Sequence, residues 1–151
     1  MKIFAVLGSV VILAWAVPAA SQFVKNSPTA QATVTVGDKT IQFKGGGCLV
    51  SDDSWSLALG DMLKGEHLEL NIPSPLRMKA TDVVKPTRDG SYSNASLTII
   101  PGAGQNWHAG GRTNGNGGTL TVVLKNNRRA GEFSGRTDGS PRQDIKGSFT
   151  C

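Results

Sequence analysis

The sequence predicts an all-β fold, a small antiparallel β-sandwich or barrel-like domain with one disulfide. Three observations predict this class. Short segments alternate between apolar and polar residues, as in His67–Ile72, where Leu68, Leu70 and Ile72 would share one face. Turn-forming residues separate these segments, and glycine alone accounts for 19 of the 151 residues. No long segment has convincing helical periodicity, and charged residues make up only 18% of the chain, which argues against a long coiled coil.

The N-terminal segment resembles a secretory signal peptide. Met1–Lys2 supplies a positive charge, Ile3–Val17 is almost wholly apolar, and small residues follow in Pro18–Ser21. The apolar stretch is short for a membrane-spanning helix, although an uncleaved anchor or a buried helix would be the alternative. We therefore expect a signal peptide at 1–21, with cleavage before Gln22 or before Ala20. Residues 22–31 would be a flexible lead-in and 32–151 a single β domain.

The first expected strands are Ala32–Val36 and Lys39–Phe43. Gly37–Asp38 between them suits a two-residue hairpin turn with glycine first. Cys48–Ser51 and Trp55–Leu59 are the next short strands, separated by Asp52–Asp53. Ser56–Leu63 could instead form a helical turn, and the sequence does not decide between the two.

The second half of the chain continues the strand pattern. His67–Ile72 is stopped by Pro73, and further strands are expected at Met78–Val84, Tyr92–Ile100, Thr119–Lys125, Glu132–Thr137 and Asp144–Cys151. Residues 101–118 are rich in glycine and asparagine, with Trp107 as the only large side chain. We interpret 101–118 as the longest loop.

The two cysteines, Cys48 and Cys151, are expected to form a disulfide if the protein is exported. Two free thiols are the alternative. Alternation in the last segment puts Cys151 on the same face as Ile145 and Phe149, so its thiol should face the core. No C-x-x-C motif is present, which disfavours a redox catalyst.

Several features together resemble the mycobacterial 19 kDa lipoprotein antigen family. They are Thr35–Lys39, Cys48 after a glycine-containing strand, Leu57–Gly60, the glycine-rich 102–118 and the closing Ser148–Cys151. The resemblance spans roughly residues 32–151 and implies an exported β-rich domain with one disulfide, attached to or shed from the cell envelope. It supplies no catalytic residues. This chain lacks the lipid-accepting cysteine that the family carries after its signal peptide.

Motifs of catalytic and metal sites are not found in the sequence. His67 and His108 are the only histidines, fewer than a zinc site normally needs once the cysteines are paired. No G-x-S-x-G, calcium-loop, P-loop or dinucleotide motif is present. We therefore expect no enzyme activity, no metal and no cofactor. An enzyme with His108 in its site would require a carboxylate and a serine beside that histidine.

Positive charge is concentrated in the last third of the chain. Residues 22–100 hold 8 Lys+Arg and 8 Asp+Glu, whereas residues 101–151 hold 7 and 3. We expect a basic C-terminal edge, and the exposed Trp107 as a further contact; the candidate binding residues are Trp107, Arg112, Arg128, Arg129 and Arg136. Arginine suits carboxylates and phosphates, so the partner would be an anionic envelope polymer, a lipid headgroup or a host surface. A solvated, functionless basic face is the alternative. Nucleic acid is not expected, because stacking aromatics do not accompany the arginines.

The expected function is therefore that of an exported, non-enzymatic, antigen-like protein of the cell envelope or the secreted fraction, acting by surface binding. The alternative is a carrier of a small apolar ligand or lipid. A carrier would need a large cavity inside the β domain, lined by Leu68, Leu70, Ile72 and Val122.

Overall fold

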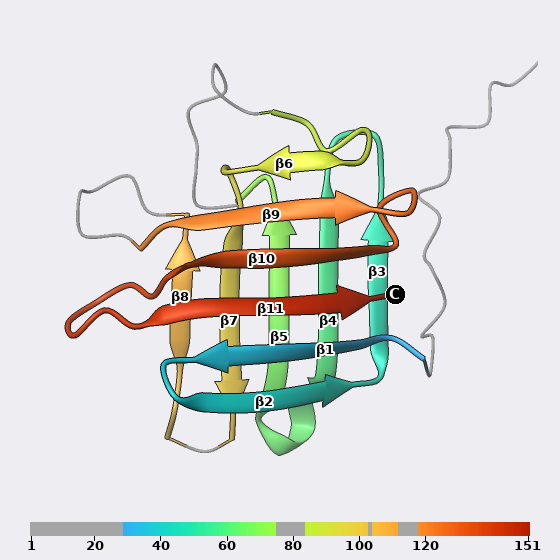
Figure 1. Cartoon of the computed structure of the whole chain (residues 1–151). Helices are drawn as coiled ribbons and strands as arrows, with labels where there is room; N and C mark the ends of the chain where they lie inside the picture. Colours follow the sequence, from blue (N-terminus) through green and yellow to red (C-terminus); the bar gives the residue numbers. More distant parts are fainter. Residues whose placement is uncertain (1–28, 75–83, 103, 112–117) are drawn as a thin grey trace, which may run out of the picture.

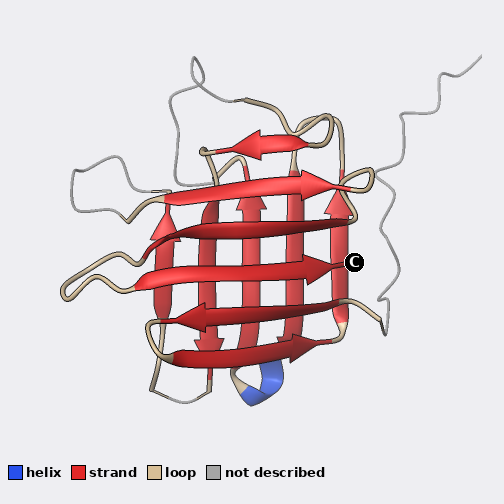
Figure 2. Ribbon diagram, in the orientation of Figure 1, coloured by secondary structure: helices blue, strands red, loops and turns tan. Residues whose placement is uncertain are grey.

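The computed structural model describes residues 29–74, 84–102, 104–111 and 118–151, and it is all-β (Figures 1 and 2). Two antiparallel sheets form a sandwich, and the strands of one sheet run crosswise over those of the other. The six-stranded sheet has the order β2-β1-β11-β10-β9-β6, and the five-stranded sheet the order β3-β4-β5-β7-β8. The strands are β1 (Gln31–Val36), β2 (Lys39–Lys44), β3 (Gly46–Val50), β4 (Trp55–Asp61), β5 (Glu66–Ile72), β6 (Gly90–Tyr92), β7 (Ser96–Pro101), β8 (Trp107–Gly110), β9 (Leu120–Lys125), β10 (Ala130–Arg136) and β11 (Asp144–Thr150).

The β1–β2 hairpin forms as the sequence predicts. Val36 pairs with Lys39 across the two-residue turn, and Gly37 has a φ of +55°, which the glycine-first turn requires. β1 already begins at Gln31, and Ala30 is fully buried. The last residues of the expected lead-in are therefore part of the domain. The segment 1–28, with the expected signal peptide, lies outside the described residues.

A glycine corner carries the chain from one sheet to the other. Gly45 and Gly46 follow β2 with φ values of +78° and +111°, a region that glycine occupies without steric cost. A Cβ on Gly46 would overlap the carbonyl oxygen of Ala58. The Gly45 amide donates to Ala30 and its carbonyl accepts from the Gly60 amide, so both sheets hold the corner. Strands that switch sheets in this way are characteristic of crosswise sandwiches.

The alternative left open at Ser56–Leu63 resolves in favour of a strand. β4 extends through Asp61 and pairs with both β3 and β5. A single turn of 3₁₀ helix, Met62–Lys64, then reverses the chain into β5, and the Asp61 carboxylate accepts from the Leu63 and Lys64 amides. Strand pairing on both sides outweighs the local helical tendency of this segment.

The expected strand Tyr92–Ile100 is wrong, because it is two strands in different sheets. β6 ends at Tyr92 and β7 begins at Ser96, with the buried Asn94 between them. The Asn94 side-chain NH2 donates to the Val84 carbonyl, and the main-chain carbonyl of Asn94 accepts from the Ser74 amide. These hydrogen bonds are made outside the strand pairing, and they favour a bend over a continued strand.

The segment 101–118 is also not one long loop. β8 forms within it and pairs with β7, so that Leu97 lies opposite the fully buried Ala109. The glycine-rich composition hid a strand of four residues. The expected strand Met78–Val84 lies outside the described residues except for Val84, which is exposed and not in a strand.

The core between the sheets depends on paired large and small residues. In β10 and β11, Gly131 lies opposite Phe149, and Phe133 lies opposite Gly147. A Cβ on Gly147 would overlap the ring of Phe133, and one on Gly131 would overlap the ring of Phe149. Each phenylalanine thus occupies the space above a glycine of the neighbouring strand. This arrangement lets two large rings share one layer of the core.

One disulfide joins the two sheets. Cys48 of β3 is bonded to Cys151, which directly follows β11, with 5.5 Å between the Cα atoms and a sequence separation of 103. The all-β sandwich and its single disulfide confirm the fold class that the sequence predicts. Among the described residues, no helix is long and apolar enough to cross a membrane.

We expect the Cys48→Ser/Cys151→Ser variant to lose roughly 2–5 kcal/mol of unfolding free energy, because the bridge no longer restricts the unfolded chain. Urea denaturation of the oxidised wild type and the double variant would measure this. Adding reductant should destabilise only the wild type. An equal effect of reductant on both proteins would contradict a Cys48–Cys151 disulfide.

Gly147→Ala should lower the unfolding free energy by about 1–3 kcal/mol, since the added methyl group overpacks against Phe133. The matched control is Ser148→Ala, one residue away on the outer face, which should change it by less than about 0.5 kcal/mol. Equal stability of the two variants in urea would show that the core tolerates the methyl group.

Candidate functional site

The outer face of the six-stranded sheet carries short hydroxyl side chains. Strand alternation turns Val34, Val36 and their neighbours inward, so the intervening residues point away from the core. A hollow of about 430 Å³ lies over β1, β11, β10 and β9. The hydroxyl residues that line it are Thr33, Thr35, Thr121, Ser134 and Ser148.

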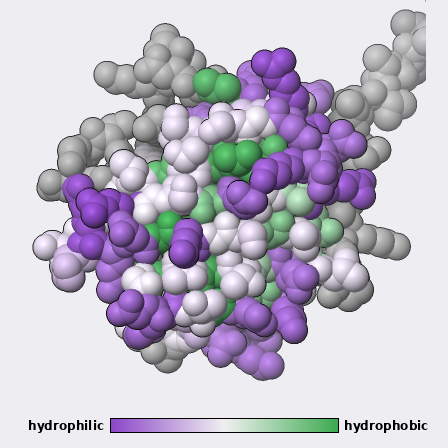
Figure 3. Space-filling model, in the orientation of Figure 1, coloured by the Kyte–Doolittle hydropathy of each residue, from purple (hydrophilic) through white to green (hydrophobic). Residues whose placement is uncertain are grey.

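A second hollow continues the first toward β2. It has a volume of about 330 Å³ and shares Thr33 and Ser148 with the first, so the two form one depression across the face. Its further polar lining residues are Gln31, Gln42, Lys44 and Thr150. We call the combined depression the hydroxyl trough. In Figure 3 the middle of this face is a mixture of pale residues and green, hydrophobic patches, with most hydrophilic residues gathered toward its sides.

Two lysines give the hydroxyl trough its charge. Lys146 lines the first hollow and Lys44 the second. Glu132 is the single carboxylate among the lining residues, and its Oε1 accepts from Lys125 Nζ at 2.8 Å. Within the described part of the chain, neither Lys44 nor Lys146 makes an ion pair.

Arg128, a predicted binding residue, is instead part of the structure that joins the two sheets. Its Nη1 donates to the carbonyl oxygens of Ser51 and Pro86, both at 2.9 Å, and the side chain is half-buried. The guanidinium therefore ties the β3–β4 turn to the segment before β6. The sequence predicts Arg128 as a binding residue of a basic edge, and in the structure its Nη1 is bonded to these two main-chain carbonyls.

The main chain around Arg128 binds a carboxylate. Asn126, Asn127 and Arg128 have φ values of 56°, 57° and 65°, and such successive left-handed residues turn their amides toward one point. The Asp89 carboxylate accepts from the Arg128 amide at 2.7 Å and from the Asn127 amide at 3.1 Å. The same segment before β6 is also held by the Lys85–Asp53 ion pair, in which Asp53 raises the pKa of Lys85.

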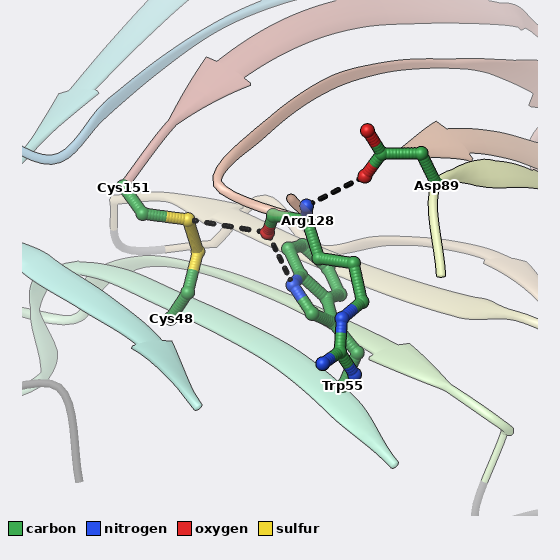
Figure 4. The surroundings of a disulfide bond; sticks show 5 residues. All are labelled: Cys48, Trp55, Asp89, Arg128 and Cys151. Carbon is green, nitrogen blue, oxygen red and sulfur yellow. Dashed lines mark hydrogen bonds between the residues drawn. A yellow bond between two sulfur atoms is a disulfide. The ribbon is translucent and has the colours of Figure 1, made fainter. Parts of the chain in front are cut away.

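The Arg128 carbonyl faces the disulfide (Figure 4). Trp55 Nε1 donates to this oxygen at 2.8 Å, which satisfies the indole of a fully buried tryptophan. Cys151 Sγ lies 3.9 Å from the same oxygen, and because the sulfur is bonded to Cys48 and has no proton, this is a contact without a donor. We call Trp55, Asp89, Arg128 and the disulfide the Arg128 corner.

The remaining predicted arginines do not form one edge. Arg129 is exposed just before β10, and Arg136 ends that strand, so about 20 Å separates them along its seven residues. Arg136 Nε donates to Asp144 Oδ1 at 2.9 Å. Arg112 lies outside the described residues. Of the predicted basic edge, the structure leaves Arg129 as an exposed cation.

Trp107 covers part of the core and is not a fully exposed binding residue. It is half-buried at the start of β8 and packs against the core cluster. Lys39 Nζ lies 5.8 Å from the ring centroid, close enough for a cation–π interaction between the two sheets. The part of the ring turned outward is thus already partnered by a cation.

His108 does not meet the requirement for a catalytic triad. Its Nδ1 lies 3.1 Å from Thr98 Oγ1, and the strand register places Glu69 on the far side of Thr98. The hydroxyl therefore lies between the acid and the imidazole, and Glu69 is not positioned to orient the ring. Among the described residues, no three His, Cys, Asp or Glu side chains gather where they could hold a metal ion.

The residues expected to line a carrier cavity fill the core. Leu68, Leu70, Ile72 and Val122 have no exposed surface. The hollows described here lie on the outside of the sheets. The space between Leu68 and Val122 is therefore filled by packed side chains and is not a ligand cavity.

Sequence reasoning missed the hydroxyl trough. A signal was present, because these hydroxyl residues alternate with apolar residues or glycine: Thr33 and Thr35 in β1, Thr121 in β9, Ser134 in β10 and Ser148 in β11. The order of the strands is needed to bring these residues together, since β1 and β9 are far apart in the sequence.

No protein-family model matches the chain, and no curated protein matches it. The candidate surfaces therefore stand on the residues of this chain alone.

Arg128→Ala should lower the unfolding free energy by about 1–3 kcal/mol, because the carbonyl groups of Ser51 and Pro86 lose their donor. Arg129→Ala, the adjacent exposed arginine, should change it by less than about 0.5 kcal/mol. Urea unfolding followed by tryptophan fluorescence would compare the two variants. Similar losses from both substitutions would contradict the structural role of Arg128.

Proposed function

We propose that this protein is an exported, non-enzymatic, antigen-like protein of the cell envelope or the secreted fraction, and that it binds anionic envelope components through its surface. The observation that carries the proposal is that three exposed cations lie at one end of the six-stranded sheet. Register places Lys44, Gln31, Thr150, Ala130 and Lys125 side by side across five strands, with Arg129 next to Ala130. We call Lys44, Lys125 and Arg129 the basic rim.

The disulfide supports export. Disulfides persist in oxidising compartments, and the Cys48–Cys151 bond is compatible with an extracellular or secreted protein. The apolar segment Ile3–Val17 and the small residues after it would supply the export signal. The resemblance to the 19 kDa lipoprotein antigen family agrees with this compartment and with attachment to, or release from, the envelope.

The packing of the core favours binding at the surface over binding inside the domain. The apolar side chains between the sheets are fully buried against one another, including the four that a carrier would need. A ligand between the sheets would have to displace this packing, at a cost of several kcal/mol. The outer face needs no such rearrangement.

The basic rim supports an anionic partner. All three of its side chains are exposed. Lys125 forms an ion pair with Glu132, so Lys44 and Arg129 supply most of the positive charge that is available to a partner. Exposed cations on one side of a domain attract polyanions and orient them, and salt weakens this attraction.

Binding of the oxidised protein to host envelope fractions, measured over a salt series, would test the proposal. Arg129→Glu should weaken binding at low salt by at least about fivefold, since the lost cation contributes about 1 kcal/mol near an anionic surface and the new carboxylate is repelled by it. The matched control is Lys64→Glu, the same charge change in the β4–β5 turn, and it should have little effect. Salt should weaken wild-type binding.

Two results would count against the proposal. Binding that neither salt nor Arg129→Glu alters would contradict an electrostatic surface mechanism. Absence of binding to any envelope fraction would contradict association with the envelope.

A further inference from the structure

The hydroxyl trough lies beside the basic rim on the outer face of the six-stranded sheet. We propose that the hydroxyl trough binds an extended acidic polysaccharide, a polymer of sugars that carry carboxylate groups. The inference rests on the proposed function and deepens it, because it names the class of partner and the surface that holds it.

The shape of the trough fits a polymer. It runs from Lys44 on β2 to Thr121 and Val123 on β9, across five neighbouring strands. At about 4.8 Å per strand this is roughly 19 Å from the first strand to the last. A small molecule would occupy only part of such a length, whereas an extended chain contacts all of it. Lys44 also belongs to the basic rim, so the two surfaces are continuous.

The floor of the trough offers many hydrogen bonds from short side chains. Each threonine or serine hydroxyl donates one hydrogen bond and accepts others. The strands hold these hydroxyls in fixed rows, as where Thr33 lies between Gln42 and Ser148 in register. Short side chains lose little conformational freedom when a ligand binds. Such a floor suits the hydroxyl groups that a sugar chain presents along its length.

The charge of the trough selects an acidic polymer. Lys44 and Lys146 are its cations, and Glu132 is already neutralised by Lys125. Carboxylates spaced along a polymer can contact both lysines at once, which a single anion cannot do. Charge-assisted hydrogen bonds of this kind are stronger than neutral ones.

Neutral sugars are disfavoured because the trough has no aromatic platform. Phe43, Phe133 and Phe149 contribute to its lining, yet each is only 3–4% exposed, with its side chain in the core. A neutral sugar ring normally stacks on an exposed aromatic face to offset the loss of its hydration. Affinity here must come from hydrogen bonds and charge.

A lipid surface fits this face less well than a polymer. The large hydrophobic side chains that are exposed in the described part of the chain are Leu63 and Val84, and neither lines the trough. The face therefore lacks the apolar side chains with which peripheral proteins enter a bilayer.

The test is binding of the oxidised full-chain protein to immobilised polygalacturonate, with dextran as the neutral polymer. Two substitutions alter the trough. Ser148→Tyr blocks its centre, and its matched control is Ser56→Tyr on the outer face of the five-stranded sheet. Lys146→Glu reverses a trough charge, and its matched control is Lys64→Glu. Urea midpoints confirm that each variant is folded, and Thr121→Tyr replaces Ser148→Tyr if that variant is unstable.

We expect polygalacturonate to bind and dextran not to bind. Ser148→Tyr should weaken binding at least tenfold and Lys146→Glu about fivefold, while each control stays within twofold of wild type. Binding to polygalacturonate that both trough variants retain would overturn the inference and leave the proposed function standing.

Other outcomes separate the two proposals further. Equal binding of polygalacturonate and dextran would overturn the selection by charge. Binding to vesicles of anionic phospholipid but not to polygalacturonate would overturn the polysaccharide and leave anionic surface binding in place. Failure to bind polygalacturonate, vesicles and host envelope fractions would overturn both proposals.

Discussion

The left-handed main chain of Asn126–Arg128 is the constraint on which much of the structure depends. It turns two amides toward Asp89 and one carbonyl toward Trp55, while the Arg128 side chain reaches the turn after β3. The β9–β10 turn thereby holds the five-stranded sheet and the segment before β6 at the same point. The disulfide lies against this turn, so covalent and non-covalent links between the sheets coincide. These hydrogen bonds and the disulfide all restrain the same two sheets relative to each other. Such links matter most in a small domain, whose core alone supplies little stability.

Strand alternation accounts for both the core and the candidate site. In β1 the valines turn inward and the threonines outward, and the same period in β9, β10 and β11 turns apolar residues and glycines inward and mostly polar residues outward. The glycines opposite Phe133 and Phe149 keep the inner layer full without widening the sheet. The outer face can then carry short side chains, because the packing of the core on the inner face supplies the stability.

Local patterns in the sequence predicted the elements that local chemistry determines. The β1–β2 hairpin, β5 and β11 follow directly from alternation and turn residues. β8 was missed because its glycine-rich surroundings resemble a loop, and the break between β6 and β7 was missed because β6 pairs with the distant strand β9. The hydroxyl trough needs the strand order, which alternation does not contain. Arg128 shows the same limit, since its charge is visible in the sequence and the carbonyl groups of Ser51 and Pro86 that use it are not.

The disulfide also determines how the molecule responds to proteolysis. Of the eleven strands in the described residues, Cys48 and Cys151 enclose eight whole strands, β4–β11, and the last part of β3 within one covalent loop. A protease that cuts a single peptide bond inside this loop converts the chain into two pieces that stay bonded through sulfur. Outside the cell, where disulfides persist and proteases are common, one cut would therefore nick the domain without releasing a fragment of it.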